Sequence, residues 1–118
     1  MKEEVMDDYS EGIIKDVQEK DGAVIISLAG EIDMKCSSEL RGKFMELFKR
    51  KPAVLIVDMT KVEFMDSSGL AILVETLKWC RQNDSRLKLV GMVQTVRSVF
   101  EISRLDSIFQ ICDTPNLI

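Results

Sequence analysis

The stretch over residues 53–57 constrains the fold most. It reads Ala-Val-Leu-Ile-Val, a continuous apolar run rich in β-branched side chains. A strand with one face in solvent alternates apolar and polar residues, whereas an unbroken run is typical of a strand that is buried on both faces. Such a strand lies in the middle of a sheet and needs other elements to cover it. The sequence therefore predicts a central strand at residues 53–57.

The segments before this run predict a hairpin and a helix. Residues 12–17 and 23–29 are apolar-rich and flank Asp21-Gly22, which is a strong turn signal, so we expect two antiparallel strands. Ser37 or Ser38 can then cap a first helix. The apolar residues of this helix recur at helical spacing: Leu40, Phe44, Leu47 and Phe48.

The segments after the run alternate between helix and strand. A second helix is predicted from Ser67 or Ser68 to Asn83-Asp84, because its apolar residues repeat at i, i+3, i+4 and i+7. A strand at residues 87–90 follows. The third helix is indicated by four residues at helical spacing: Val96, Val99, Phe100 and Ser103. With a last apolar piece at residues 108–111, this order predicts an α/β domain with parallel crossovers and mixed pairing at its start.

Length and charge favour one domain without a nucleic-acid partner. The 118 residues fit a single domain, 1–118, in which residues 1–11 form an acidic N-terminal extension that we expect to be flexible. This extension accounts for the net charge of −4, and the rest of the chain is balanced. A nucleic-acid binder normally has a strongly basic face, and the sequence has no basic run longer than Lys49-Arg50-Lys51.

Other absences narrow the chemistry and the location. The sequence has no histidine, which excludes Ser-His-Asp and Cys-His catalysis and the common histidine-bearing metal sites. Its three cysteines include no C-x-x-C pair and suggest reduced thiols. It also has no apolar run of membrane-spanning length and no secretion signal. We therefore expect a cytoplasmic protein with no membrane association, no metal and no cofactor.

The cluster Asp66-Ser67-Ser68-Gly69 has a structural and a chemical interpretation. In the first, Ser67 or Ser68 caps the second helix, and the helix dipole favours Asp66. In the second, a serine at an exposed helix start accepts a phosphate, which adds about −1.5 to −2 charges at pH 7. That charge would repel or block a partner docked there, so the serine would be a switch. A nucleophilic serine is disfavoured because no histidine can act as its base.

Two motifs resemble one family. Phe-Met-Asp-Ser-Ser-Gly-Leu at residues 64–70 resembles the phosphorylation motif of bacterial anti-sigma factor antagonists, which are small single-domain STAS proteins. Gly30-Glu31-Ile32-Asp33 resembles the second loop signature of the same family, and the resemblance covers nearly the whole chain. It implies a STAS-like α/β fold, with a mixed four- to five-stranded β-sheet and helices packed mainly on one face.

The resemblance also implies a function by partner switching. In that family the unphosphorylated antagonist binds an anti-sigma factor that is itself a serine kinase, which releases a sigma factor for transcription. The kinase phosphorylates the serine after the motif's aspartate, and a PP2C-type phosphatase restores it. By position, Ser67 is the acceptor, Asp66 the preceding acid and Asp33 the acid of the neighbouring loop, while Ser68 and Gly69 belong to the partner-binding surface. We therefore expect a regulatory protein, not an enzyme, that is a monomer when free.

Two alternatives stay open. The chain could be a STAS scaffold subunit of a stress-signalling complex, but such relatives often carry threonine at the phosphate sites, where this chain has Ser67 and Ser68. It could also be a STAS domain that binds a nucleotide or small ligand at the strand-to-helix turn. The lack of a glycine-rich loop with a nearby lysine argues against that function.

Overall fold

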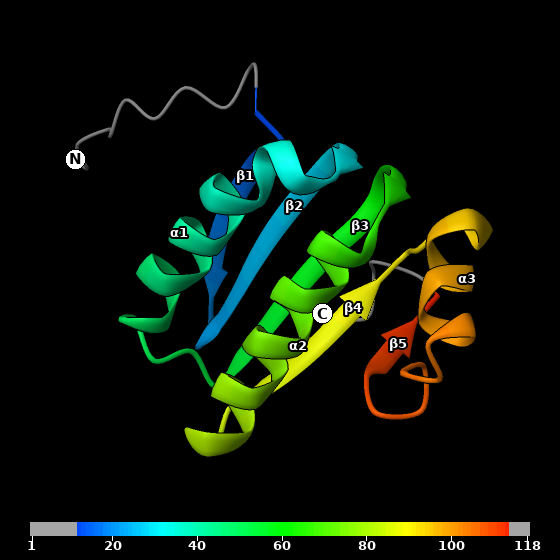
Figure 1. The fold of residues 1–118 in the computed structure, drawn as a ribbon. Coiled ribbons are helices and arrows are strands. Elements are labelled where there is room, and N and C mark those ends of the chain that lie inside the picture. The colour runs from blue at the N-terminus through cyan, green and yellow to red at the C-terminus, as the bar shows by residue number, and fades with distance from the viewer. Residues whose placement is uncertain (1–11, 114–118) are drawn as a thin grey trace.

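A computed structural model of the chain describes residues 12–113, and the predicted N-terminal extension lies outside them. Within these residues, five strands form a sheet, and three α-helices and one short 3-10 helix connect them (Figure 1). In chain order the elements are β1 (Ile14–Lys20), β2 (Ala23–Ile32), η1 (Met34–Cys36), α1 (Ser37–Phe48), β3 (Val54–Met65), α2 (Ser67–Gln82), β4 (Arg86–Val90), α3 (Gln94–Ile102) and β5 (Gln110–Cys112).

The sheet has the order β1-β2-β3-β4-β5, so β3 is the central strand, as predicted. Only β1 and β2 pair antiparallel, and the other three pairings are parallel, which confirms the mixed sheet. Leu55 and Val57 point into the main core, and Ile56 belongs to a smaller apolar cluster with Ile25 and Val90. Because side chains alternate along a strand, β3 is buried on both of its faces.

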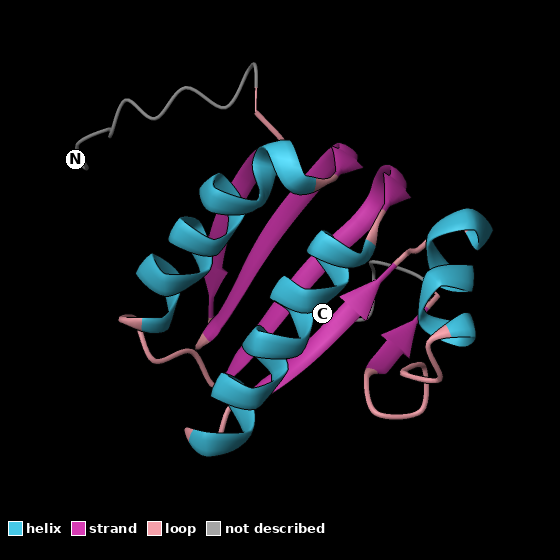
Figure 2. Cartoon of the chain, viewed as in Figure 1, coloured by secondary structure: helices cyan, strands magenta, loops and turns pink. Residues whose placement is uncertain are grey.

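The helices cover one face of the sheet, as the family resemblance implies. Figures 1 and 2 show α1 lying over β1 and β2, and α2 lying over β3 and β4. The rings of Phe48 in α1 and Trp79 in α2 stack with centroids 4.2 Å apart and an interplanar angle of 6°. Nearby, Arg41 Nε lies 3.0 Å from Glu75 Oε1 and joins the same two helices at the surface. These contacts fix α2 relative to α1.

The central strand is longer than the sequence predicted. Beyond Asp58, β3 continues to Met65 and pairs with β2 alone, and β3 carries one extra residue opposite Ser27–Ala29 and another opposite Gly30–Glu31. Gly30 has a φ of 98°, which glycine adopts at little cost and which suits the second irregularity. Because these bulges break the alternation of buried and exposed residues, the extension does not follow the simple strand pattern.

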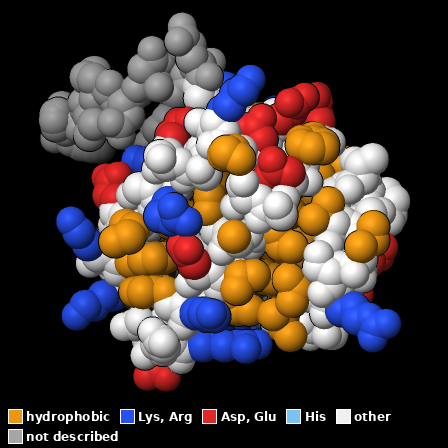
Figure 3. Space-filling view, in the orientation of Figure 1, with side chains coloured by type: hydrophobic (Ala, Val, Ile, Leu, Met, Phe, Trp, Pro, Cys, Tyr) orange, Lys and Arg blue, Asp and Glu red, His pale blue; other side chains and the backbone are white. Residues whose placement is uncertain are grey.

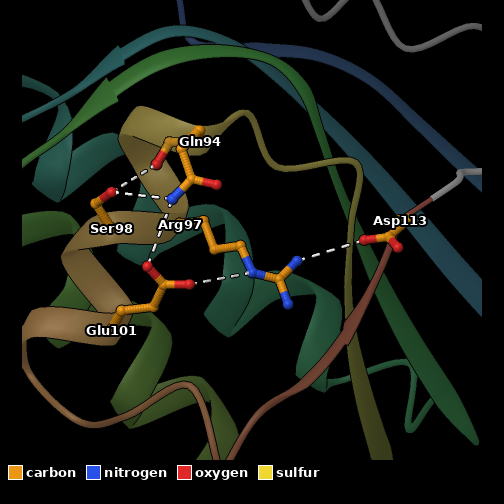
Figure 4. A network of polar contacts seen from close by, with 5 residues as sticks. All are labelled: Gln94, Arg97, Ser98, Glu101 and Asp113. Carbon is orange, nitrogen blue, oxygen red and sulfur yellow. Dashed lines mark hydrogen bonds and ion pairs between the residues drawn. The ribbon is translucent and has the colours of Figure 1, made fainter.

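A polar network lies on α3, and Arg97 links it to the segment after β5 (Figure 4). Arg97 Nη1 lies 3.4 Å from Asp113 Oδ1, just beyond β5, and Arg97 Nε lies 3.6 Å from Glu101 Oε2 in the next turn. Gln94 Nε2 donates to Glu101 Oε1 at 3.4 Å. The helix ends at Ile102, so Ser103, which was expected within the helical pattern, is its C-cap.

Candidate functional site

The two family motifs meet where β2 and β3 end. Ile32 and Met65 are register partners and are both buried, and the backbone N–H of Asp66 donates to the carbonyl oxygen of Ile32 at 3.1 Å. Asp33 follows Ile32 directly. Parallel β2 and β3 end together at this edge of the sheet, which we call the carboxyl edge. Asp33 and Asp66 therefore leave neighbouring strands at the same place.

Asp66 is the residue that caps α2. Its backbone is extended, and its Oδ1 accepts hydrogen bonds from the N–H groups of Ser68 at 2.8 Å and Gly69 at 3.3 Å. The interpretation of Ser67 or Ser68 as the cap is therefore wrong. An aspartate cap satisfies two of the N–H groups that lack partners in the helix and places a negative charge at the positive end of the dipole.

Ser67 is the first residue of α2 and is exposed. Because Asp66 does the capping, the Ser67 hydroxyl is not needed for it, and within residues 12–113 it has no hydrogen-bond partner. Ser68 is half-buried, and its backbone N–H already binds Asp66. Of the two serines, Ser67 is thus the more accessible to a modifying enzyme.

Asp33 plays the same local role for the 3-10 turn. Its Oδ1 accepts a hydrogen bond from the backbone N–H of Lys35 at 3.0 Å, an Asx-type turn that starts η1. The N-cap of α1 is Cys36 without a side-chain cap bond, so the prediction that Ser37 or Ser38 caps this helix is wrong. The 3-10 turn removes the need for that cap by leading the chain directly into α1.

Gly69 lies in the first turn of α2 and is buried against the ends of β2 and β3. Its role in this position is close packing.

Two large apolar residues near the ends of β2 and β3 are exposed, although the sequence does not mark them as part of the site: Met34 at 73% and Phe64 at 47%. An exposed large apolar residue is indistinguishable from a core residue in a single sequence, so only their positions in the fold reveal them.

A hollow of about 460 Å³ lies next to Asp33. It is lined by residues from β1, β2, η1 and the start of α1, including Lys15, Lys35, Glu31 and Glu39. None of residues 66–69 lines it, so the hollow is separate from the turn between β3 and α2. Its mixed charges single out no class of ligand.

The site offers little for covalent catalysis by this chain. Burial raises the pKa of the Cys36 thiol, and the nearby carboxylates of Asp33 and Glu39 add to this effect, so the reactive thiolate is disfavoured. Within residues 12–113, no group of three or more histidine, cysteine or acidic side chains could hold a metal ion. The arrangement can present an exposed hydroxyl and a shaped surface to another protein.

The helices among residues 12–113 include none that is long and apolar enough to span a membrane.

Comparison with known proteins agrees with this architecture. An anti-sigma-B factor antagonist of Listeria monocytogenes is 34% identical over 98 residues, which cover 81% of this chain and 85% of that protein. A solved anti-sigma factor antagonist from Mycobacterium paratuberculosis is 28% identical, with a TM-score of 0.78 and 85% of each chain covered. The anti-sigma factor antagonist SpoIIAA in its unphosphorylated form is 25% identical, with a TM-score of 0.71 over 83% of this chain and 86% of that one. The family model for the STAS domain matches residues 15–117, and the chain belongs to this family.

Proposed function

We propose that this protein is an anti-sigma factor antagonist that works by partner switching. In its unphosphorylated form it binds an anti-sigma factor, and the sigma factor that this partner held is released. The proposal is supported by the relatives, which are named anti-sigma factor antagonists and match most of the chain. The carboxyl edge, with both family motifs side by side, is the surface that docks the partner.

The switch is phosphorylation of Ser67. The observation that carries this proposal is the exposed Ser67 hydroxyl, which follows the capping Asp66 and has no hydrogen-bond partner in the described part of the chain. A phosphate there would not disrupt α2, because the positive end of a helix tolerates a dianion. The partner-binding surface comprises Asp33, Asp66, Ser67 and Ser68, and the buried Gly69 supports it by holding the first turn of α2 against β2 and β3.

The other partners follow from this switch. The anti-sigma factor is the serine kinase that adds the phosphate, and a PP2C-type phosphatase removes it. The chain itself has no catalytic activity and acts in the cytoplasm, as a monomer when free. Neither nucleic acid nor a membrane is part of its function.

A competition experiment tests the proposed function. Each anti-sigma factor serine kinase from the genome that encodes this chain is purified in complex with its sigma factor, and the unphosphorylated chain is added in increasing amounts. We expect one kinase to exchange its sigma factor for this chain, seen by size-exclusion chromatography and by restored transcription. The same protein after phosphorylation at Ser67 is the control and should leave the complex intact. If no kinase releases its sigma factor, the proposed function is wrong.

A further inference from the structure

Apolar side chains stand exposed at the same edge as Ser67. Six large hydrophobic side chains are exposed within residues 12–113, and three of them lie at the carboxyl edge: Met34, Phe64 and Val93. The other three lie in α1, at the end of α3 and before β5: Met45, Ile102 and Ile108. Apolar groups concentrated in this way on a protein surface mark a place where another molecule binds.

The backbone brings the three residues to this edge. Phe64 is the register partner of Glu31, one position before the buried pair of Ile32 and Met65, so it points away from the core. Met34 follows Asp33 in η1. The Thr95 hydroxyl donates to the carbonyl oxygen of Glu63 at 3.3 Å. This bond holds the start of α3, with its N-cap Val93, against the end of β3.

Acidic side chains also lie at the carboxyl edge, near these apolar ones. Glu31, Asp33, Glu63 and Asp66 all lie within two residues of the ends of β2 and β3. None of these four carboxylates takes part in an ion pair with the described residues. Figure 3 shows acidic and hydrophobic side chains next to one another where β2 and β3 end. The edge therefore combines exposed apolar side chains with four carboxylates that form no ion pair among residues 12–113.

We propose that Met34, Phe64 and Val93 anchor the anti-sigma factor, and that this partner presents an apolar recess bordered by lysine or arginine side chains. The inference rests on the proposed function and adds the chemistry of the partner's surface. Methionine and aromatic residues are enriched at the buried centres of interfaces, where a few of them supply most of the binding energy. The four unpaired carboxylates supply charge complementarity, which steers a basic partner and speeds association.

This surface also explains how a phosphate on Ser67 would act. A partner with a basic border is attracted to negative charge, so simple repulsion would not release it. A phosphate standing beside Met34 and Phe64 would instead keep its water, because removing water from a dianion is costly, and the apolar contact could not close. The switch thus works by blocking the anchors.

Serine substitutions at exposed apolar positions test the anchors. The chain and its variants are titrated calorimetrically against each anti-sigma factor serine kinase of the same genome. Phe64→Ser and Met34→Ser should each weaken binding at least about tenfold, as expected for anchor residues. Met45→Ser and Ile102→Ser are the controls, because they remove large apolar side chains that are also exposed but lie away from the edge, and they should bind as tightly as the original chain. Melting temperatures confirm folding. If Phe64→Ser is unfolded, Met34→Ser decides the test, since Met34 is 73% exposed.

A salt series tests the charges separately. The association rate of the original chain should fall as salt increases, and the double variant Glu31→Gln/Glu63→Gln should associate more slowly at low salt and show a flatter dependence. Anchor variants that bind as tightly as the two controls, or an association rate that is independent of salt, would overturn the inference while the proposed function stands. If the chain binds none of the kinases, both the inference and the proposed function are wrong.

Discussion

Gly69 packs so closely against Ile32 that a Cβ at position 69 would lie 2.6 Å from the Cγ2 atom of Ile32. The Cγ atom of Met65 would be 2.7 Å away. No other residue type fits without movement, because real side chains do not approach so closely. The first turn of α2 is thus pressed onto the ends of β2 and β3, and this contact sets the position of Ser67 relative to the sheet.

Gly69→Ala should therefore destabilise the protein. Alanine is favoured over glycine inside a helix by about 1 kcal/mol, but overpacking a buried site costs about 1 to 3 kcal/mol, so the net effect is a loss of stability. Gly42→Ala in α1 is the matched control, because nothing lies within 4 Å of a Cβ there, and it should leave stability unchanged or raise it. Urea unfolding measures both. If both variants gained the same stability, the residues around Gly69 would have moved to accommodate the added methyl group at no energetic cost.

Asp66 allows its capping role to be separated from its charge. Asp66→Ala removes the acceptor of the Ser68 and Gly69 N–H groups and should cost about 1 kcal/mol of stability. Asp66→Asn keeps an oxygen acceptor and should remain within a few tenths of a kcal/mol of the original, since asparagine caps about as well as aspartate. Thermal unfolding of the two variants compares them directly. An asparagine variant as unstable as the alanine one would mean that the charge, not the hydrogen bond, stabilises the start of α2.

The sequence predicted the order of the elements because apolar periodicity and burial agree in most of them. Leu55, Ile56 and Val57 are buried on alternate faces of β3, and the apolar stripe of α2 faces the core. The extension of β3 was not predicted because the extra residues in β3 itself place Met59, Val62 and Met65, rather than alternate residues, in the core. Buried apolar residues that are three positions apart lack the alternation by which a strand is recognised in a single sequence.

For the site, the motif positions were predictable, but the roles of neighbouring side chains were not. Serine and aspartate are both good N-caps, so N-cap preferences do not distinguish Ser67 from Asp66. The hydrogen bonds that Asp66 accepts identify it as the cap. Phe64 and Met65 are both large apolar residues, so the sequence alone does not say which of them is buried. They are adjacent in one strand, so the pleat buries Met65 and leaves Phe64 exposed.

Phosphate should be found on Ser67 and not on Ser68. Ser67 is exposed, whereas Ser68 is half-buried with its N–H bound to Asp66. After incubation with the cognate kinase and ATP, mass spectrometry of proteolytic peptides locates the phosphate. Ser67→Ala should abolish incorporation, and Ser68→Ala, the matched control, should retain it. If Ser68→Ala abolished incorporation and Ser67→Ala retained it, Ser68 would be the phosphate acceptor.

The purified chain should not hydrolyse nucleotides. It has no histidine and no glycine-rich phosphate loop with a lysine, so neither a base nor a phosphate cradle is available at Ser67. Release of phosphate from ATP and GTP by the pure protein should equal the buffer background, and Asp66→Asn and Ser67→Ala should be the same. Sustained hydrolysis that disappears in these two variants would contradict the assignment as a regulatory protein.

Ser67→Glu should weaken binding to the anti-sigma factor without unfolding the protein. A carboxylate imitates a phosphate only in part, so we expect a loss of about 1 to 3 kcal/mol, the cost of burying an unsatisfied polar group at an interface. Stability should not fall, because an acid in the first turn of a helix is favoured by the dipole. Ser67→Ala should bind normally and resist phosphorylation. Calorimetry gives the affinities, and circular dichroism verifies the fold.

The salt dependence of the phosphorylated protein shows how the switch acts. The screening length shortens from about 10 Å at 0.1 M salt to about 3 Å at 1 M, so binding blocked by long-range repulsion would recover as salt is added. Binding blocked by a hydrated phosphate beside Met34 and Phe64 would not recover, because salt does not remove the cost of dehydration. We expect no recovery. If phosphorylated protein and folded Ser67→Glu both bind as tightly as the unmodified chain at every salt concentration, Ser67 is not the switch.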